Sequence, residues 1–159
     1  MARIPSTEPR TVTIQAKPLT ANAFAPYGKV LDRAQFVLES KEFPFFANVT
    51  TLAPARDEIT YINRHHDHNQ IFASFGEPMV VIVAAPALRR DGFEADQIEA
   101  FVTDGRSAIV FDIDTWHIAP RSAGPEAIRA LNVQAIHNDV HTERIEMSDL
   151  GCRVWLDVG

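Results

Sequence analysis

Between residues 48 and 135 the chain alternates short β-like segments with turn-forming residues such as Gly76, Pro78 and Gly105. Strands that follow one another roughly every eight to twelve residues favour a β-sandwich or a small barrel. Long, strongly periodic helical segments are missing, which disfavours an α/β doubly wound fold. The segments that we predict as strands are Thr11–Ala16, Val49–Leu52, Ile59–Arg64, Gln70–Phe75, Met79–Ala85, Ile98–Thr103, Ser107–Phe111, Trp116–Ala119 and Ala130–Ala135.

One of these segments identifies the centre of the sheet. Met79–Ala84 is apolar at successive positions, so it is expected to be buried on both faces. Before it, Thr20 is positioned to cap a short helical turn over Ala21–Phe24. We therefore predict an all-β barrel with few short helices. The aromatic residues expected to fill part of its core are Phe36, Phe43, Phe45 and Phe46.

Length and charge limit the classes of protein that fit. With 159 residues, of which 46% are hydrophobic, the chain suits one domain with a real core. We expect residues 1–10 to be a flexible leader and residues 11–159 to form this domain. The net charge of -6 argues against a nucleic-acid partner, whose binding surfaces are normally basic.

Several features favour a soluble, cytoplasmic protein. The only cysteine is Cys152, so no intramolecular disulfide framework exists and a reducing compartment is expected. The N-terminal residues lack the apolar run of a signal peptide. The longest nearly uninterrupted apolar stretch, Pro78–Leu88, is about half the length of a membrane span. No membrane partner is therefore expected.

Histidines mark the candidate site. Four of the six fall in two segments, Asn63–Gln70 and Thr115–His117. The first segment holds His65, His66 and His68 within four residues, beside an arginine and a glutamine. Imidazole is the side chain best suited to bind a metal or to move a proton near neutral pH. The two segments are therefore expected to meet in one pocket, whereas His137 and His141, in a polar run, are interpreted as surface residues.

Strand parity divides the histidine cluster. On an extended strand, alternate residues face the same side. If the strand is regular, one face carries Asn63 and His65. The opposite face carries Arg64, His66, His68 and Gln70.

The second face suggests a metal centre. Two histidines one residue apart on a strand, joined by a third from a distant strand, are a familiar ligand layout for Zn, Ni, Mn or Fe. One divalent transition metal is therefore a candidate cofactor. Its candidate ligands are His66, His68, Gln70 and His117. Against this hypothesis, Gln70 is a poorer ligand than a glutamate, and Asp67 and Asn69 make the segment polar enough for a solvated turn.

A wider set of residues resembles one known family. The chain carries, in order over most of residues 15 to 136, several short motifs that are similar to those of the ureidoglycolate lyase family, a branch of the cupin superfamily. These motifs are Tyr27-Gly28-Lys29-Val30, Arg64-His65 followed by Gln70 and Phe72, Pro78 with the run Val80–Ala84, Ala100-Phe101 followed by Gly105, and Trp116-His117.

The resemblance implies a cupin-type double-stranded β-barrel (jelly roll), usually a homodimer. It implies an enzyme of purine breakdown through allantoin that splits ureidoglycolate, a small carboxylate, into glyoxylate and urea. Lysis of this hemiaminal needs a base for the hydroxyl proton and an acid for the departing nitrogen. His65 or His66 and His117 are candidates for these two roles. Arg64 is the candidate for binding the carboxylate, and Gln70 for orienting the urea group.

The chain also departs from the family pattern. The family has Glu-Arg-His-Pro where this chain has Asn63-Arg64-His65-His66, and a second histidine after Trp-His where this chain has Ile118. Two alternatives therefore stay open. One is a metal-dependent cupin enzyme, such as an isomerase or dioxygenase, acting on another small polar acid. The other is a non-catalytic cupin that binds a small ligand.

Overall fold

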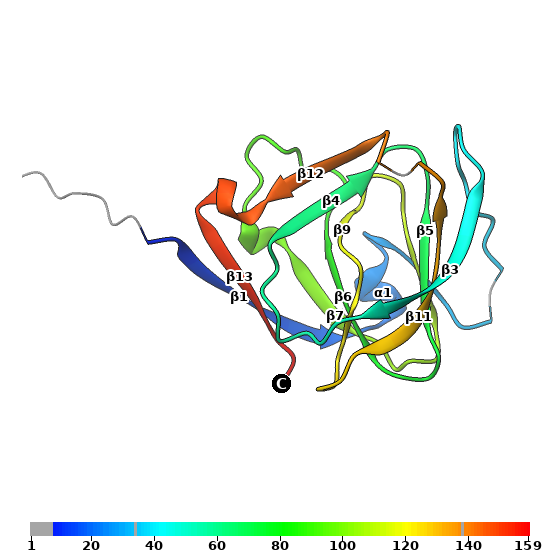
Figure 1. Cartoon of the computed structure of the whole chain (residues 1–159), viewed down its shortest axis with the longest axis horizontal. Helices are drawn as coiled ribbons and strands as arrows, with labels where there is room; N and C mark the ends of the chain where they lie inside the picture. Colours follow the sequence, from blue (N-terminus) through cyan, green and yellow to red (C-terminus); the bar gives the residue numbers. More distant parts are fainter. Residues whose placement is uncertain (1–7, 34, 138) are drawn as a thin grey trace, which may run out of the picture.

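Strands dominate the described part of the chain, which comprises residues 8–33, 35–137 and 139–159 of a computed structural model. They form two sheets that curl around a common interior (Figure 1). The first sheet contains β1 (Arg10–Pro18), β4 (Tyr61–His65), β6 (Met79–Ala84), β7 (Glu99–Val102), β9 (Trp116–His117), β10 (Arg121–Ser122), β12 (Thr142–Glu146) and β13 (Cys152–Asp157). The second contains β2 (Gly28–Leu31), β3 (Phe45–Leu52), β5 (Gln70–Ser74), β8 (Ala108–Phe111) and β11 (Ile128–Ala135). The predicted all-β barrel is confirmed.

The strand order brings distant segments together. The first sheet runs β12-β4-β9-β6-β7-β1-β13, with β10 paired to β6, and the second runs β2-β8-β5-β11-β3. The short strand β9 lies between β4 and β6, so that His117 is opposite Asn63 on one side and Val83 on the other. This pairing places the two histidine segments next to each other.

The core has two layers, and β6 contributes to both. Each residue of Met79–Ala84 is fully buried, as predicted from its unbroken apolar sequence. Val80, Ile82 and Ala84 pack in one cluster, and the alternate residues of the strand pack in the other. Because successive side chains point to opposite faces, this one strand joins the two halves of the core.

Helices are few and short. The turn α1 (Ala21–Phe24) begins as predicted, because the Thr20 hydroxyl accepts a hydrogen bond from the backbone N–H of Ala23 at 3.1 Å. The other helical turns are η1 (Ala95–Gln97) and η2 (Met147–Leu150). None of the helices in the described residues is long and apolar enough to cross a membrane.

Four strands were not predicted: β2, β10, β12 and β13. The last pairs in parallel with β1, from Arg10 opposite Cys152 onward, so β1 begins one residue inside the predicted leader. Residues 1–7 of that leader lie outside the described residues. The expectation about core aromatics was wrong, since its four phenylalanines are only partly buried. The phenylalanines that fill the core are Phe24, Phe72, Phe93, Phe101 and Phe111.

Candidate active site

A turn separates the two strands of the histidine segment, so the condition of a regular strand through residues 63–70 is not met. β4 ends at His65, β5 begins at Gln70, and residues 66–69 connect them. Parity therefore holds within β4, where Asn63 and His65 share a face, but it does not carry across the turn. As a result, His65 and Gln70 face the same cavity although their parity differs.

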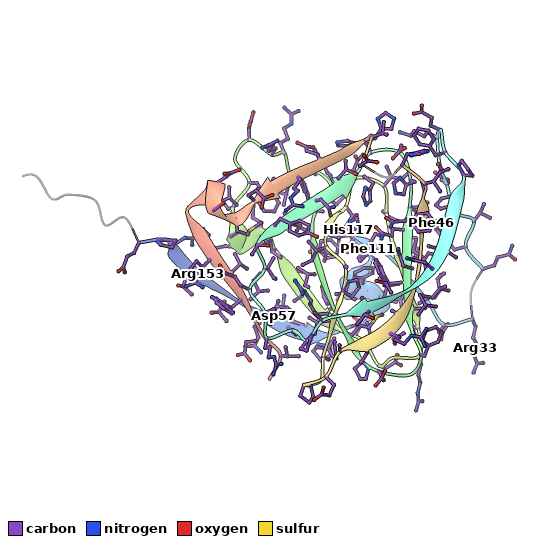
Figure 2. All side chains as sticks on the ribbon, viewed as in Figure 1. Arg33, Phe46, Asp57, Phe111, His117 and Arg153 are labelled. Atoms are coloured by element: carbon purple, nitrogen blue, oxygen red, sulfur yellow. The ribbon has the colours of Figure 1, made fainter. Side chains whose placement is uncertain are left out.

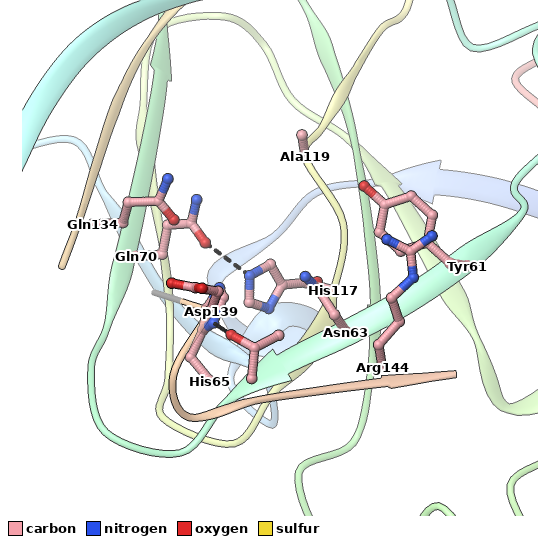
Figure 3. Close-up of a pocket in the computed structure, with 10 residues that line it drawn as sticks. Tyr61, Asn63, His65, Gln70, His117, Ala119, Gln134, Asp139 and Arg144 are labelled. Carbon is pink, nitrogen blue, oxygen red and sulfur yellow. Dashed lines mark hydrogen bonds between the residues drawn. The ribbon is translucent and has the colours of Figure 1, made fainter. Parts of the chain in front are cut away.

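This cavity has a volume of about 460 Å³ and opens between the two sheets. Figure 3 shows Gln70 and Gln134 on one side of His117, with Tyr61 and Arg144 on the other. The residues that line it are Tyr61, Asn63, His65, Gln70, His117, Ala119, Gln134, Asp139, Thr142 and Arg144. Of the predicted site residues, His65, Gln70 and His117 are thus brought together.

His117 lies in the interior of the barrel, with 3% of its surface exposed (Figure 2). Its ring stacks on Phe111 at 4.3 Å between centroids, and Nδ1 lies 2.8 Å from the main-chain oxygen of Thr115. Burial, together with the nearby charge of His65, lowers the pKa of His117 to about 3. His117 is therefore neutral near pH 7, with its proton on Nδ1.

A chain of amides leads away from this ring. Nε2 of His117 lies 2.9 Å from Oε1 of Gln70, whose Nε2 donates to Oδ1 of Asn132 at 2.9 Å. Asn132 in turn donates to Oδ1 of Asn48 at 3.2 Å. When Oε1 of Gln70 faces Nε2 of His117, this nitrogen must carry a proton, and with a proton on Nδ1 as well the ring is positively charged. When His117 is neutral, Nε2 is an acceptor, so the Gln70 amide must turn its NH₂ group toward it. The donor–acceptor direction of the hydrogen bonds from Gln70 through Asn132 to Asn48 is thus coupled to the charge of His117.

His65 is the second imidazole of the cavity and is 6% exposed. Nδ1 lies 2.8 Å from the hydroxyl oxygen of Thr142, its partner across the β4–β12 pair. The ring meets His117 edge to face at 5.1 Å between centroids and stacks on His68 at 4.5 Å. Packing on two sides therefore fixes the orientation of His65.

His68 lies behind His65 and does not line the cavity. It is 1% exposed, and Nδ1 lies 2.8 Å from Oδ1 of the buried Asp67. Its Nε2 is buried and has no hydrogen-bond partner within the described residues. His68 thus supports the position of His65.

Arg64 points to the opposite side of β4. Its Nε and Nη2 contact Glu143 at 2.8 and 2.7 Å, and Nη1 donates to the main-chain oxygens of Pro86 and Leu88 at 3.1 Å each. The guanidinium also lies over the ring of Trp116, 4.4 Å from its centroid. The structure therefore does not bring Arg64 into the cavity, because alternation along β4 directs it away from Asn63 and His65.

His66 also faces away from the cavity. Nδ1 contacts Asp114 and Nε2 lies 3.3 Å from Glu143. It begins the turn after β4, at a position that leaves it half-exposed. His66 is therefore placed between two carboxylates on the outer surface, apart from His117 and Gln70.

The predicted ligands do not converge as a metal site requires. His68 lies outside the cavity, stacked on His65 with 22° between their planes. Nδ1 of His117 faces a carbonyl, and His66 faces away. Among the described residues, no group of three or more His, Cys, Asp or Glu side chains could hold a metal ion.

Sequence reasoning missed the cation that lines the cavity. Arg144, on β12, lies with its guanidinium carbon 3.7 Å from the ring centroid of Tyr61, and its Nε contacts Glu146. Thr142 and Arg144 have the same parity in this strand and both line the cavity. The sequence Thr142–Glu146 gave little sign of a strand, because Ile145 is its one apolar, buried residue.

Comparison with known proteins places these features in a family. Residues 44–149 match the family model described as ureidoglycolate lyase. The ureidoglycolate lyase of Pseudomonas fluorescens (strain SBW25) is 26% identical over 127 residues, which covers 66% of this chain and 74% of that protein. The enzyme of the same name from Pseudomonas syringae pv. tomato is 29% identical over 130 residues, covering 68% and 74%.

A solved structure shows the same architecture. The dTDP sugar isomerase from Desulfovibrio desulfuricans G20 superposes with a TM-score of 0.50 at 17% identity, covering 76% of this chain and 73% of that one. At this identity the likeness shows the fold alone. The predicted cupin-type barrel is confirmed.

Proposed function

Because the chain belongs to the ureidoglycolate lyase family, we propose that it splits ureidoglycolate into glyoxylate and urea. The observation that carries this proposal is the meeting of His65, His117 and Gln70 on the wall of one cavity. These three residues belong to the motifs in which the chain resembles the family. They include two imidazoles, which can supply the proton transfer that the reaction needs. A cavity of about 460 Å³ is large enough for a ligand of this size.

The reaction is a proton-coupled bond cleavage. The central carbon of ureidoglycolate carries a hydroxyl, a carboxylate and a urea nitrogen. As the hydroxyl loses its proton, the carbon–oxygen bond becomes a carbonyl and the carbon–nitrogen bond breaks. The electron pair of that bond goes to the nitrogen, which takes up a proton to give urea. The net change moves one proton from oxygen to nitrogen, so one residue can serve as base and then as acid.

His65 fits this role better than His117. With a pKa of about 3, His117 is a weak base near neutral pH, and general bases act best when their pKa is near the working pH. His65 lines the same cavity and is fixed by Thr142 and the two neighbouring rings. In this proposal His65 accepts the hydroxyl proton and returns it to the nitrogen. His117, neutral and coupled to Gln70, orients the urea group.

The carboxylate of the substrate needs a cation, and we assign it to Arg144 in place of Arg64. Arg144 lines the cavity, whereas Arg64 is held outside it by Glu143. The contact with Glu146 uses Nε of Arg144. The two terminal nitrogens are the ones that a carboxylate would contact, because the planar fork of arginine matches it.

The test is release of both products above the spontaneous background. Purified protein without a histidine tag is expected to release urea and glyoxylate in equal amounts. His65→Ala should lower turnover by roughly a hundredfold or more, while His137→Ala, an exposed histidine, should not change it. If the unaltered protein releases no more urea than the background, the lyase proposal fails.

Two further proposals are tested on the same sample. Dialysis against a chelator is expected to leave turnover unchanged, whereas loss of activity that a divalent metal restores would favour the metal-dependent alternative. We also propose a homodimer, by likeness to the family, which light scattering after size exclusion would test.

A further inference from the structure

Arg121 is a partly buried cation that has no counter-charge among the described residues. Among the described arginines, only Arg64 and Arg121 are partly buried rather than exposed. Arg64 pairs with Glu143, but Arg121 makes no ion pair or hydrogen bond with any described side chain. Its Nε is buried and lacks an acceptor within the described residues. A buried donor left unpaired is costly, so Nε of Arg121 is available to an acceptor that comes from outside the chain.

Arg121 lines a second cavity of about 160 Å³. The lining residues are Thr51, Leu52, Ala53, Tyr61, Ile118, Ala119, Pro120 and Arg121. Arg121 is the only charged residue among them, and no carboxylate is present. An anion that entered this cavity would therefore meet one cation and no opposing charge.

The second cavity adjoins the candidate active site. Tyr61 and Ala119 line both cavities, so the two spaces share a wall. Arg144 stacks on the ring of Tyr61 at the first cavity, and Arg121 belongs to the second. Two cations thus lie along one connected surface.

The backbone around Arg121 is fixed. Arg121 pairs with Val80 of the central strand β6. The next residue, Ser122, donates its N–H to the main-chain oxygen of Ala53 at 2.8 Å and accepts from the N–H of Ala55 at 3.0 Å. Arg121 is therefore held beside the second cavity by regular backbone pairing, which is the condition for a preorganised binding group.

From these observations we propose that Arg121 forms an anion subsite that extends the candidate active site and binds a second carboxylate. The preferred ligands are then small dicarboxylates, with one carboxylate at Arg144 and the other at Arg121. Ureidoglycolate has a single carboxylate, so the inference goes beyond the proposed function. Combined with that function, it names ureido acids with a second carboxylate as the substrate class.

Equilibrium binding without turnover tests this subsite. The full chain, labelled with ¹⁵N and ¹³C, is titrated at low ionic strength with acetate and with the dicarboxylates from malonate to pimelate. The Ala119 methyl signal reports on both cavities. We expect the best dicarboxylate to bind at least about tenfold more tightly than acetate, since each charge-assisted contact adds affinity.

Matched arginine variants decide the source of that gain. Arg121→Gln should abolish it, whereas Arg129→Gln, on an exposed arginine of β11, should retain it. Arg121→Lys keeps the charge without the planar fork, so an intermediate affinity is expected, and this variant serves if Arg121→Gln does not fold.

Two outcomes overturn the proposal. One is a wild-type protein that binds acetate and all dicarboxylates equally. The other is an Arg121→Gln variant that binds acetate and the dicarboxylates as the unaltered protein does. If the oligomer mass of this variant also changes, Arg121 pairs with a second copy of the chain. Because binding is measured without catalysis, failure here and failure of the lyase proposal are distinguishable.

Discussion

The imidazole rings of His65 and His117 lie 5.1 Å apart, with 64° between their planes, although the two residues come from different strands. Two rings at this distance cannot both be positively charged at low cost. His117 is fully enclosed, so burial, with nearby His65 adding to the effect, favours its neutral form and lowers its pKa to about 3. In the proposed mechanism, this difference assigns the proton transfer to His65 and the orienting role to His117.

Stability should therefore depend on pH through His117. Its pKa is lower in the folded protein than the ordinary value of 6.5, so the unfolded chain binds more protons between these values. The contribution is fully present above pH 6.5 and is lost as pH falls toward 3. From pH 7.5 to pH 5 we expect the free energy of unfolding to fall by about 2 kcal/mol through this residue. Urea unfolding at the two pH values measures the change.

His117→Gln is the control for this pH effect. The variant lacks the titrating ring, so its loss of stability over the same interval should be smaller by about the same 2 kcal/mol. An equal pH dependence in the two proteins would mean that other groups cause it.

The amide chain gives a second prediction. Asn132 is 5% exposed and is hydrogen-bonded to the Gln70 amide, which it orients. Asn132→Ala should lower the free energy of unfolding by about 1–2 kcal/mol, because the buried Gln70 amide loses a hydrogen-bond partner. It should also reduce kcat more than it raises KM, since Asn132 positions Gln70 without touching the substrate.

Asn48→Ala provides the graded comparison, because Asn48 is exposed at the far end of the chain. Steady-state kinetics and urea unfolding of both variants are needed. Equal effects at the two positions would contradict a directional chain that ends at His117.

Close backbone packing at β2 gives a third prediction. A Cβ atom at Gly28 would lie 1.8 Å from the main-chain oxygen of Val110, which does not yield without moving the strand. Gly28 pairs with Phe111, the residue on which His117 stacks. Gly28→Ala should thus cost about 1–3 kcal/mol of stability and reduce turnover as well.

Gly124→Ala is the matched change in an open position, where the nearest atom would be the Ser122 hydroxyl oxygen at 3.8 Å. Thermal unfolding and turnover of this variant should stay near those of the unaltered protein. If both alanine variants behave alike, the contact between β2 and β8 does not limit the site.

The fold was predictable where a strand is apolar by itself. The six consecutive apolar residues of β6 predict a central, fully buried strand. The Thr20 cap is predictable because it depends on neighbouring residues alone. β12 and β13 were not predicted, because their pairing is not local. β13 joins β1 from the other end of the chain, and in β12 only Ile145 is fully buried. Such strands exist because of their partners, which sequence patterns do not reveal.

The site was predictable by residue type but not by direction. His65, Gln70 and His117 lie together as expected, yet the metal hypothesis depended on one continuous strand. The turn at residues 66–69 breaks that continuity and leaves His66 outside. The predicted strands Ile59–Arg64 and Gln70–Phe75 already left a gap here, but alternation cannot give the direction of side chains across a turn. Arg64 was likewise chosen by residue type, because a guanidinium suits a carboxylate. Its direction along β4 places it outside the cavity.

The two arginines therefore give the most discriminating prediction. Arg144→Gln should raise KM for ureidoglycolate by about tenfold or more, because a charge-assisted contact to the carboxylate is lost. Its stability should change little, since the side chain is half exposed and its ion pair with Glu146 lies at the surface.

Arg64→Gln should behave in the opposite way. That side chain is 13% exposed and contacts Glu143, two main-chain oxygens and the Trp116 ring, so the free energy of unfolding should fall by about 2–4 kcal/mol with KM unchanged. Steady-state kinetics and urea unfolding on both variants make the comparison. If Arg64→Gln raises KM and Arg144→Gln does not, the carboxylate binds on the other face of β4 and the assignment of the cavity is reversed.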